Sequence, residues 1–192
     1  MATEIGPRVF PEGLPNIFQL QDQIEDAWDN GYNSRGREET GGIKGTRKFI
    51  GTQEAQALFS NLNIKCSPRR FQDSKERPAF EQVVDDIDSY FQRSCPSIEE
   101  DGTKVHSTML PPIYFQRPGH SSVIIGLEKT VQNERHLLIF DPGHRYQDAT
   151  HSLQAFSQRR KQDTLEPYRL RFEKLRKYDT FELLYLTLGA ED

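Results

Sequence analysis

A histidine and an aspartate stand where two consecutive strand-like runs would bring them together. His120 follows Pro118 and Gly119 at the start of a β-branched run, and Asp141 ends an aliphatic run directly before Pro142. A carboxylate can accept a hydrogen bond from one imidazole nitrogen and leave the other nitrogen as a base, which is the arrangement of a nucleophilic triad. We therefore predict that the side chains of His120 and Asp141 lie in contact.

Simpler roles for these two residues stay open. The Asp141 side chain can serve only to cap the turn before Pro142, and His120 can be an ordinary residue at the edge of a sheet. His144, shortly after Asp141, is a second candidate base. Another histidine, His136, starts a predicted strand and is expected to face solvent. The histidines do not form the helical pairs that hold metals, so we expect neither a metal nor a cofactor.

Neither cysteine has the sequence context of a nucleophile. Cys66 falls in a predicted strand and Cys95 in a predicted loop before Pro96. Reactive thiols usually have a pKa lowered by a helix N-terminus or a neighbouring cation, so we expect both to be inert. Two cysteines are too few for a disulfide scaffold, which favours reduced thiols in an intracellular protein, cytoplasmic or nuclear.

Strand-like runs in the second half of the chain must position His120 and Asp141. Residues 121–128 and 136–140 are predicted to pair as an antiparallel hairpin, with residues 130–134 as its turn. In that pairing the start of one strand lies beside the end of the other. Further strands are predicted at residues 64–67, 113–116 and 181–188.

Helical periodicity dominates the first half of the chain. Apolar residues recur at helical spacing over residues 17–28, with Asn16 as the N-cap, and a second helix starts at Thr52, which is the predicted cap. A third helix has Pro78 in its first turn. Residues 151–178 are expected to be helical with an interruption near Pro167, and residues 33–48 and 94–108 are expected to be loops.

This order of elements predicts an α+β fold. Residues 1–14 are expected to be irregular, and residues 15–192 to form a single domain. Hydrophobic residues make up 34% and charged residues 28% of the chain, whose net charge is −4. The basic stretch at residues 159–177 is interleaved with acids, which argues against nucleic acid as a partner. No secretory signal or membrane-spanning run is apparent, so we expect no membrane association.

The second half of the chain resembles the papain-like cysteine proteases specific for ubiquitin and ubiquitin-fold modifiers. That family shows a Pro-Pro-Ile-Tyr strand, a Gln-x-x-Gly-His-Ser motif, an Ile-Gly pair and an aliphatic strand that ends in Asp-Pro-Gly. The chain carries these motifs in the same order, at residues 111–114, 116–121, 125–126 and 137–143. Upstream motifs match as well, at residues 24–28 and 45–51 and at Glu54. The similarity is greatest to the branch that contains zinc-finger ubiquitin peptidases.

The resemblance implies a papain-like fold in which helices pack on a central antiparallel sheet. It implies His120 as the general base and Asp141 as its orienter, with Gln116 as a further candidate. In the modifier-specific branch the strand ends in Asp-Pro-His. Gly143 replaces that histidine here, which favours His120 over His144.

The resemblance also implies a nucleophile that the printed sequence does not show. In the family it is a cysteine in a Trp-Gly-Cys-Gly-Tyr-Arg segment, which opens a helix upstream of the Ile-Glu-Asp-Ala-Trp helix. No cysteine precedes Ile24 in this chain. We therefore expect a truncated peptidase domain that lacks its N-terminal catalytic helix and is inactive as written.

Three functional hypotheses follow from the resemblance. The first is the C-terminal part of a deubiquitinase-like or modifier-specific thiol protease, which hydrolyses the peptide or isopeptide bond after Gly-Gly. The second is a non-catalytic pseudo-protease that binds ubiquitin, polyubiquitin chains or a ubiquitin-fold modifier. The third is a degenerate remnant without a stable fold, because loss of a core helix would leave its neighbours without packing partners.

Overall fold

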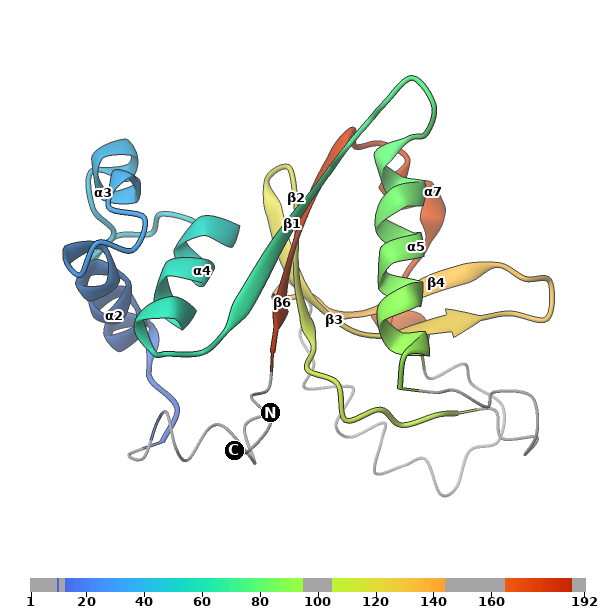
Figure 1. Cartoon of the computed structure of the whole chain (residues 1–192), viewed down its shortest axis with the longest axis horizontal. Helices are drawn as coiled ribbons and strands as arrows, with labels where there is room; N and C mark the ends of the chain where they lie inside the picture. The colour runs from blue at the N-terminus through green and yellow to red at the C-terminus, as the bar shows by residue number, and fades with distance from the viewer. Residues whose placement is uncertain (1–9, 11–12, 95–104, 144–164, 188–192) are drawn as a thin grey trace. The chain divides into compact units, whose positions relative to one another are not determined.

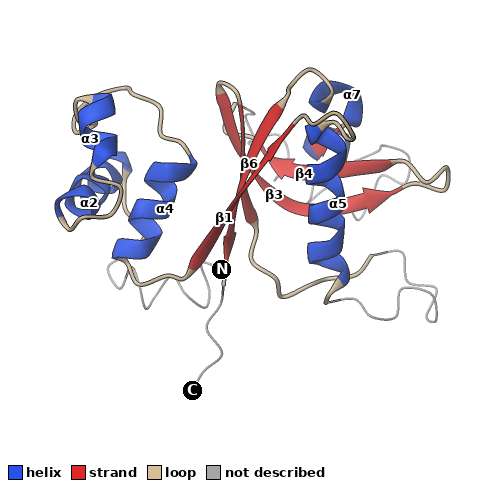
Figure 2. Cartoon of the chain, turned by 45° about the horizontal axis from the view of Figure 1, so that its top comes forward, coloured by secondary structure: helices blue, strands red, loops and turns tan. Residues whose placement is uncertain are grey.

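The computed structural model describes residues 10, 13–94, 105–143 and 165–187 (Figure 1). The described residues form two compact units. The first unit includes residues 10, 13–69, 111–113 and 182–187, and the second includes residues 70–94, 105–110, 114–143 and 165–181. Figure 2 shows the helices and strands of both, and the predicted α+β class is confirmed.

The helices of the first unit pack around the tryptophan. Helix α2 spans Ile17–Asp29, and its N-cap Asn16 exchanges hydrogen bonds with Gln19 in a capping box, as predicted for this start. Helix α4 spans Thr52–Asn61 and packs against α2. Buried residues from both helices and from the segment between them form one core: Ile24, Ala27, Trp28, Ile43, Ala57 and Leu58.

The expected loop over residues 33–48 contains a helix, so that prediction is wrong in part. Helix α3, Arg35–Thr40, has no apolar periodicity from which it could be predicted, and it is too short to be stable alone. Contacts with α2 hold it: Gly36 is buried against Trp28, and a Cβ at residue 36 would lie 2.8 Å from Trp28 Nε1. Tertiary contact rather than local propensity therefore forms α3.

The cap of α4 also differs from the prediction. Thr52 is the first helical residue and is buried, whereas Gly51 is the N-cap. Glu54 Oε2 accepts a hydrogen bond from the backbone N–H of Gly51 at 2.7 Å. The carboxylate therefore satisfies a backbone donor at this helix start.

Six strands form one sheet in the order β1-β6-β2-β3-β4-β5. Strands β3 and β4 pair antiparallel, as do β4 and β5, and residues 130–134 form the predicted turn of the β3–β4 hairpin. The predicted strand at residues 64–67 starts later and runs further, as β1. The bounds are β1 Cys66–Gln72, β2 Ile113–Arg117, β3 His120–Lys129, β4 Arg135–Phe140, β5 Arg169–Leu170 and β6 Thr180–Leu186.

A β-bulge interrupts the β3–β4 pairing. Ile124 lies opposite Ile139, but Gly126 lies opposite Leu138, so Ile125 is the extra residue. Bulges of this kind bend a strand and increase its twist. The part of β3 before the bulge, which carries His120 at its start, therefore follows its own register against the end of β4.

Helix α5, Ala79–Gln92, packs on β3 in the second unit. Along its apolar stripe Val83, Val84 and Ile87 are fully inaccessible, and Phe80 and Phe91 are half-buried. Pro78 is the N-cap residue, one position before the first turn that was predicted for it. Ion pairs fasten the polar side of the helix to the hairpin, from Asp85 to Arg135 at 2.6 Å and from Asp88 to Lys129 at 2.9 Å.

The prediction of a helix over residues 151–178, interrupted near Pro167, is wrong for most of its described part. Residues 165–178 hold a 3-10 turn at Glu166–Tyr168, strand β5 and the short helix α7, Phe172–Leu175. Arg169 donates to both carboxylate oxygens of Glu128, and Leu170 pairs with Leu137. Pairing with β4 thus overrides the helical pattern of a charged segment.

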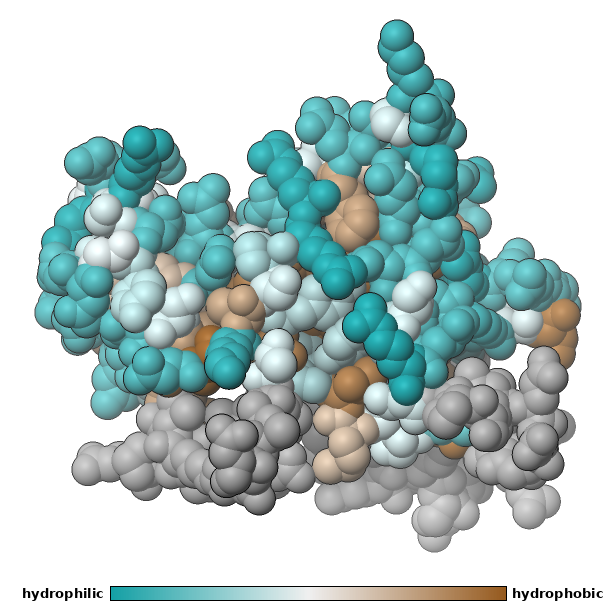
Figure 3. All heavy atoms as spheres, in the orientation of Figure 1, coloured by the Kyte–Doolittle hydropathy of each residue, from teal (hydrophilic) through white to brown (hydrophobic). Residues whose placement is uncertain are grey.

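The described surface is polar, in keeping with the composition. Figure 3 shows a face on which hydrophilic side chains predominate. Within the described ranges, no helix is long and apolar enough to cross a membrane. The prediction of a single domain over residues 15–192 stays a prediction, and residues 1–9 of the expected irregular segment lie outside the described part of the chain.

Candidate active site

A tight turn between β2 and β3 places His120. Pro118 fixes its own φ angle, and Gly119 has a φ of +74°, in the left-handed region that side chains other than glycine avoid. The turn reverses the chain after Arg117, so that His120 is the first residue of β3, as predicted. The histidine therefore sits on an extended, hydrogen-bonded strand rather than on a loop.

Strand β4 delivers Asp141 to the same face of the sheet. Ile124 and Ile139 are cross-strand partners on the buried face, and side chains two residues apart share a face. Asp141 follows Ile139 by two positions, and His120 precedes Ile124 by four. Continuing the register places the aspartate diagonally across from the histidine, within reach of its ring.

The two side chains are in contact, as predicted. His120 Nε2 lies 2.8 Å from Asp141 Oδ2, and the side chains are 30% and 18% exposed. An ionised carboxylate can only accept hydrogen bonds, so the shared proton sits on Nε2. The neutral imidazole therefore keeps Nδ1 free of its proton, and Nδ1 is the nitrogen able to act as a base.

Asp141 also caps the turn that follows β4. Its Oδ1 atom accepts a hydrogen bond from the backbone N–H of Gly143 at 2.8 Å. Asp141 therefore does both things considered from the sequence. Its Oδ1 atom caps the turn, and its Oδ2 atom contacts His120. The turn bond fixes the carboxylate, which in turn orients the ring of His120.

Cys66 is the one cysteine among the described residues, and its surroundings do not activate it. It lies at the start of β1, with its Sγ 3.9 Å from the Ser60 hydroxyl and 4.0 Å from the Gln56 carbonyl. Burial raises the pKa of the Cys66 thiol, and the hydrogen bond with Ser60 offsets this only in part. The predicted inert character of this thiol fits its geometry.

Comparison with known proteins decides the family. The model of peptidase family C78 matches residues 4–184. The chain belongs to peptidase family C78. The family's cysteine-peptidase character agrees with the resemblance inferred from residues 111–143.

Relatives of this C78 chain are named as ubiquitin peptidases. The chain is 34% identical over 133 residues to zinc finger-containing ubiquitin peptidase 1 of Mus musculus, a match that covers 68% of the chain and 22% of that protein. It is 29% identical over 141 residues to ubiquitin carboxyl-terminal hydrolase mug105 of Schizosaccharomyces pombe, covering 73% of the chain and 51% of that protein. The chain thus spans about a fifth of the first relative and half of the second.

A solved structure supports the papain-like fold. The crystal structure of UfSP from C. elegans superimposes with a TM-score of 0.52 and 13% sequence identity, over 94% of this chain and 26% of that one. At this identity the likeness concerns the fold alone. The predicted fold class, helices with an antiparallel sheet in the papain-like arrangement, is confirmed.

Of the other candidate residues of this C78 chain, some lie among the described residues and some do not. Gln116 lies in β2, half-buried. His144 and Cys95 lie outside the described residues. His136 was expected to face solvent, but its side chain is only 14% exposed, so that expectation is wrong. The described residues hold no group of three or more side chains that could bind a metal.

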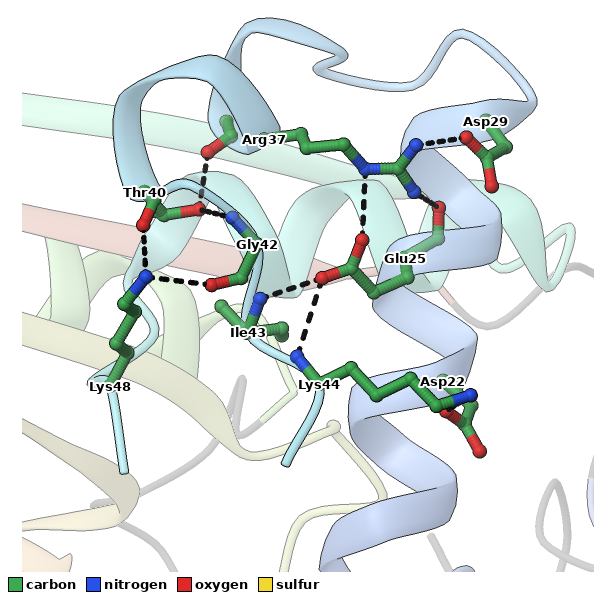
Figure 4. A network of polar contacts seen from close by, with 10 residues as sticks. Asp22, Glu25, Asp29, Arg37, Thr40, Gly42, Ile43, Lys44 and Lys48 are labelled. Atoms are coloured by element: carbon green, nitrogen blue, oxygen red, sulfur yellow. Dashed lines mark hydrogen bonds and ion pairs between the residues drawn. The ribbon is translucent and has the colours of Figure 1, made fainter. Parts of the chain in front are cut away.

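A second polar cluster, in the first unit, was not singled out from the sequence (Figure 4). Glu25 Oε1 accepts from the N–H groups of Ile43 and Lys44, at 2.6 and 3.3 Å, while Oε2 accepts from Arg37 at 2.8 Å. Arg37 also pairs with Asp29. The sequence did offer one sign of this cluster. The backbone N–H groups of the glycine-rich segment 36–45 need hydrogen-bond partners, and a nearby carboxylate can provide them.

This second cluster is built to hold the backbone rather than to react. Burial acts to raise the pKa of Glu25, but the hydrogen bonds from Ile43, Lys44 and Arg37 outweigh it, and the pKa lies below its ordinary value. Lys48 Nζ donates to the carbonyls of Thr40 and Gly42 at the end of α3. The Glu25 cluster, meaning Glu25 with its partners Arg37, Ile43 and Lys44 together with Asp29, which pairs with Arg37, therefore fastens α3 and the following segment to α2.

Proposed function

We propose that this chain carries the general base and the orienting carboxylate of a thiol peptidase that cleaves after the C-terminal glycine of ubiquitin or a ubiquitin-fold modifier. The observation that carries the proposal is the contact of His120 Nε2 with Asp141 Oδ2 in a C78 chain. The names of its relatives, both ubiquitin peptidases, support this substrate class.

In the proposed reaction His120 acts first as a base, then as an acid, and again as a base when water attacks. Its Nδ1 atom takes the proton of the attacking cysteine thiol, and the thiolate forms an acyl-enzyme with the modifier's terminal carbonyl. The imidazolium then gives that proton to the leaving amine. Asp141 stabilises the imidazolium through Oδ2 and is itself held by the Gly143 N–H. Water completes hydrolysis, with His120 again acting as base.

Cys66 is not the nucleophile of this proposal. Its thiol has a raised pKa and hydrogen-bonds within the first unit. We expect purified 1–192 to show no turnover of ubiquitin with a fluorogenic C-terminal amide. Turnover that disappears in Cys66→Ser or Cys95→Ser would contradict this assignment. The genomic sequence directly 5′ of the Met1 codon is the place to look for an in-frame Trp-Gly-Cys-Gly-Tyr-Arg-like segment.

Modifier binding tests the proposal without needing a nucleophile. Ubiquitin, or a ubiquitin-fold modifier, is titrated into 1–192 labelled with 15N histidine, and the ring signals of His120 are followed by NMR. We expect a saturable shift with at least one modifier. The same modifier lacking its two C-terminal glycines is the matched control and should leave His120 unperturbed. If neither intact modifier shifts these signals, the proposal is wrong.

A non-catalytic, modifier-binding role is the second candidate. Cys66 is the one thiol among the described residues, and burial raises its pKa, so these residues supply no activated nucleophile, and a binding module needs none. Saturable binding to 1–192 together with an upstream genomic sequence that encodes no cysteine would support this role. Turnover by a chain extended through such a cysteine, abolished by His120→Ala, would support the peptidase.

A further inference from the structure

Arg117 ends β2 directly before the turn that presents His120, and its side chain is anchored. Its Nη1 atom donates a hydrogen bond to Tyr178 Oη at 2.6 Å. The guanidinium carbon also lies 5.1 Å from the centroid of the Tyr178 ring. The same tyrosine is thus contacted by Arg117 both as a hydrogen-bond acceptor and as a π face.

Tyr178 is itself fixed by the core of the second unit. Its ring meets Phe181 edge to face at 6.3 Å, and Phe181 stacks on Phe115 at 5.7 Å. Both phenylalanines are fully buried, and the Tyr178 N–H bonds to the Leu175 carbonyl at 3.0 Å. Arg117 therefore binds a tyrosine ring that is itself packed against buried phenylalanine side chains.

The turn transmits this anchoring to His120. Only Pro118 and Gly119 separate the two residues; both are exposed, and no atom outside the turn lies within 4 Å of a Cβ built at Gly119. Because few atoms pack on the turn itself, the position of His120 depends on contacts made by the residues at either end of the turn. At the end of the turn His120 is held by the hydrogen bond of its Nε2 atom with Asp141, and at the start of the turn Arg117 is held by Tyr178.

We propose that Arg117 and Tyr178 are positioning residues for His120, which keep its imidazole in register with Asp141. This inference rests on the proposed function for its biological meaning, but its test does not. The relevant quantity is the integrity of the hydrogen bond from His120 Nε2–H to Asp141, which NMR reports directly. Loss of the contact between Arg117 and Tyr178 should leave the fold intact and weaken the hydrogen bond between His120 and Asp141.

The experiment compares the His120 ring in variants of 1–192. In Arg117→Ala we expect exchange of the Nε2 proton with water to rise about fivefold, the factor that corresponds to one typical hydrogen bond. The ring nitrogen shifts should move toward those of Asp141→Ala, which serves as the reference for a lost pair. Tyr178→Phe, which keeps the ring and loses the oxygen, should give a smaller change, and Arg117→Lys should recover part of the wild-type behaviour.

Arg176→Ala is the matched control. Arg176 makes the same kind of contact in the same unit, 5.4 Å from the Phe80 ring centroid, but it does not adjoin the turn. It should leave the His120 signals unchanged. The inference is wrong if Arg117→Ala keeps wild-type Nε2 exchange, or if Arg176→Ala changes it equally, since that would indicate general destabilisation. A failed modifier titration with a positive result here would overturn only the proposed function.

Discussion

At the scale of single residues, the site is defined by how Asp141 uses its two oxygens. Oδ2 holds the imidazole of His120 and Oδ1 holds the N–H of Gly143. An ionised carboxylate offers acceptors for both donors, which no neutral side chain of the same size does. The aspartate therefore links the end of β4 to the start of β3 and selects the tautomer of the His120 ring.

Replacing Asp141 with asparagine tests this double use. Asparagine has one acceptor oxygen, so it can serve His120 or the Gly143 N–H but not both. We expect a loss of about 1–2 kcal/mol in the free energy of unfolding, measured with urea, and a weaker preference for the Nε2–H tautomer, measured from the ring 15N shifts. Wild-type values for both quantities in Asp141→Asn would show that one of the two bonds is dispensable.

At the scale of elements, the β2–β3 turn and the β3–β4 hairpin bring distant residues together. The hairpin pairs residues that the chain separates, and the bulge at Ile125 lets β3 keep apolar side chains against β4 on both sides of it. Gly119, with its φ of +74°, is the position where the backbone itself demands glycine. The placement of His120 thus depends on this backbone conformation as well as on side-chain contacts.

A substitution at Gly119 should therefore cost stability through strain alone. We expect Gly119→Ala to lower the free energy of unfolding by about 1 kcal/mol, because alanine is disfavoured at positive φ although the space around it is open. Gly119→Asn should cost less, since asparagine tolerates this region.

Gly126→Ala, on the strand β3 that follows the turn, is the control. Its φ is not in the left-handed region, and an added Cβ would meet Leu138 Cδ1 at an ordinary 3.5 Å. Urea unfolding measures all three variants. A Gly119→Ala loss no larger than that of Gly126→Ala would contradict the strain argument.

At the scale of the whole molecule, each compact unit has its own polar fastening. In the first unit the Glu25 cluster ties α3 and the segment after it to α2. In the second, Asp85 and Asp88 tie α5 to the β3–β4 hairpin. In both units these partly buried ion pairs supplement the apolar contacts that hold the elements together.

The Glu25 cluster makes the first unit sensitive to acid. The folded-state pKa of Glu25 lies below the ordinary value of 4.5, so folding favours the ionised form. The stabilisation is present above pH 4.5 and is lost as the pH falls through the folded-state pKa. We expect Glu25→Gln to be less stable than wild type at pH 7 and the difference to shrink in acid, as measured by denaturant unfolding at several pH values. A constant difference from pH 7 to pH 3 would show that ionisation of Glu25 does not contribute.

The sequence by itself determined the elements whose pattern repeats locally and the two candidate site residues that the structure brings into contact. Apolar periodicity predicted α2 and α5, β-branched runs predicted the β3–β4 hairpin, and residue type singled out His120 and Asp141. Only the tertiary structure decided α3, the strand at Arg169–Leu170 and the inward position of His136. Helix α3 and strand β5 are short segments without a periodic pattern of their own. Their conformation comes from partners outside each segment, Trp28 and Glu25 for α3 and Glu128 and Leu137 for β5, and no pattern within the segment carries that information.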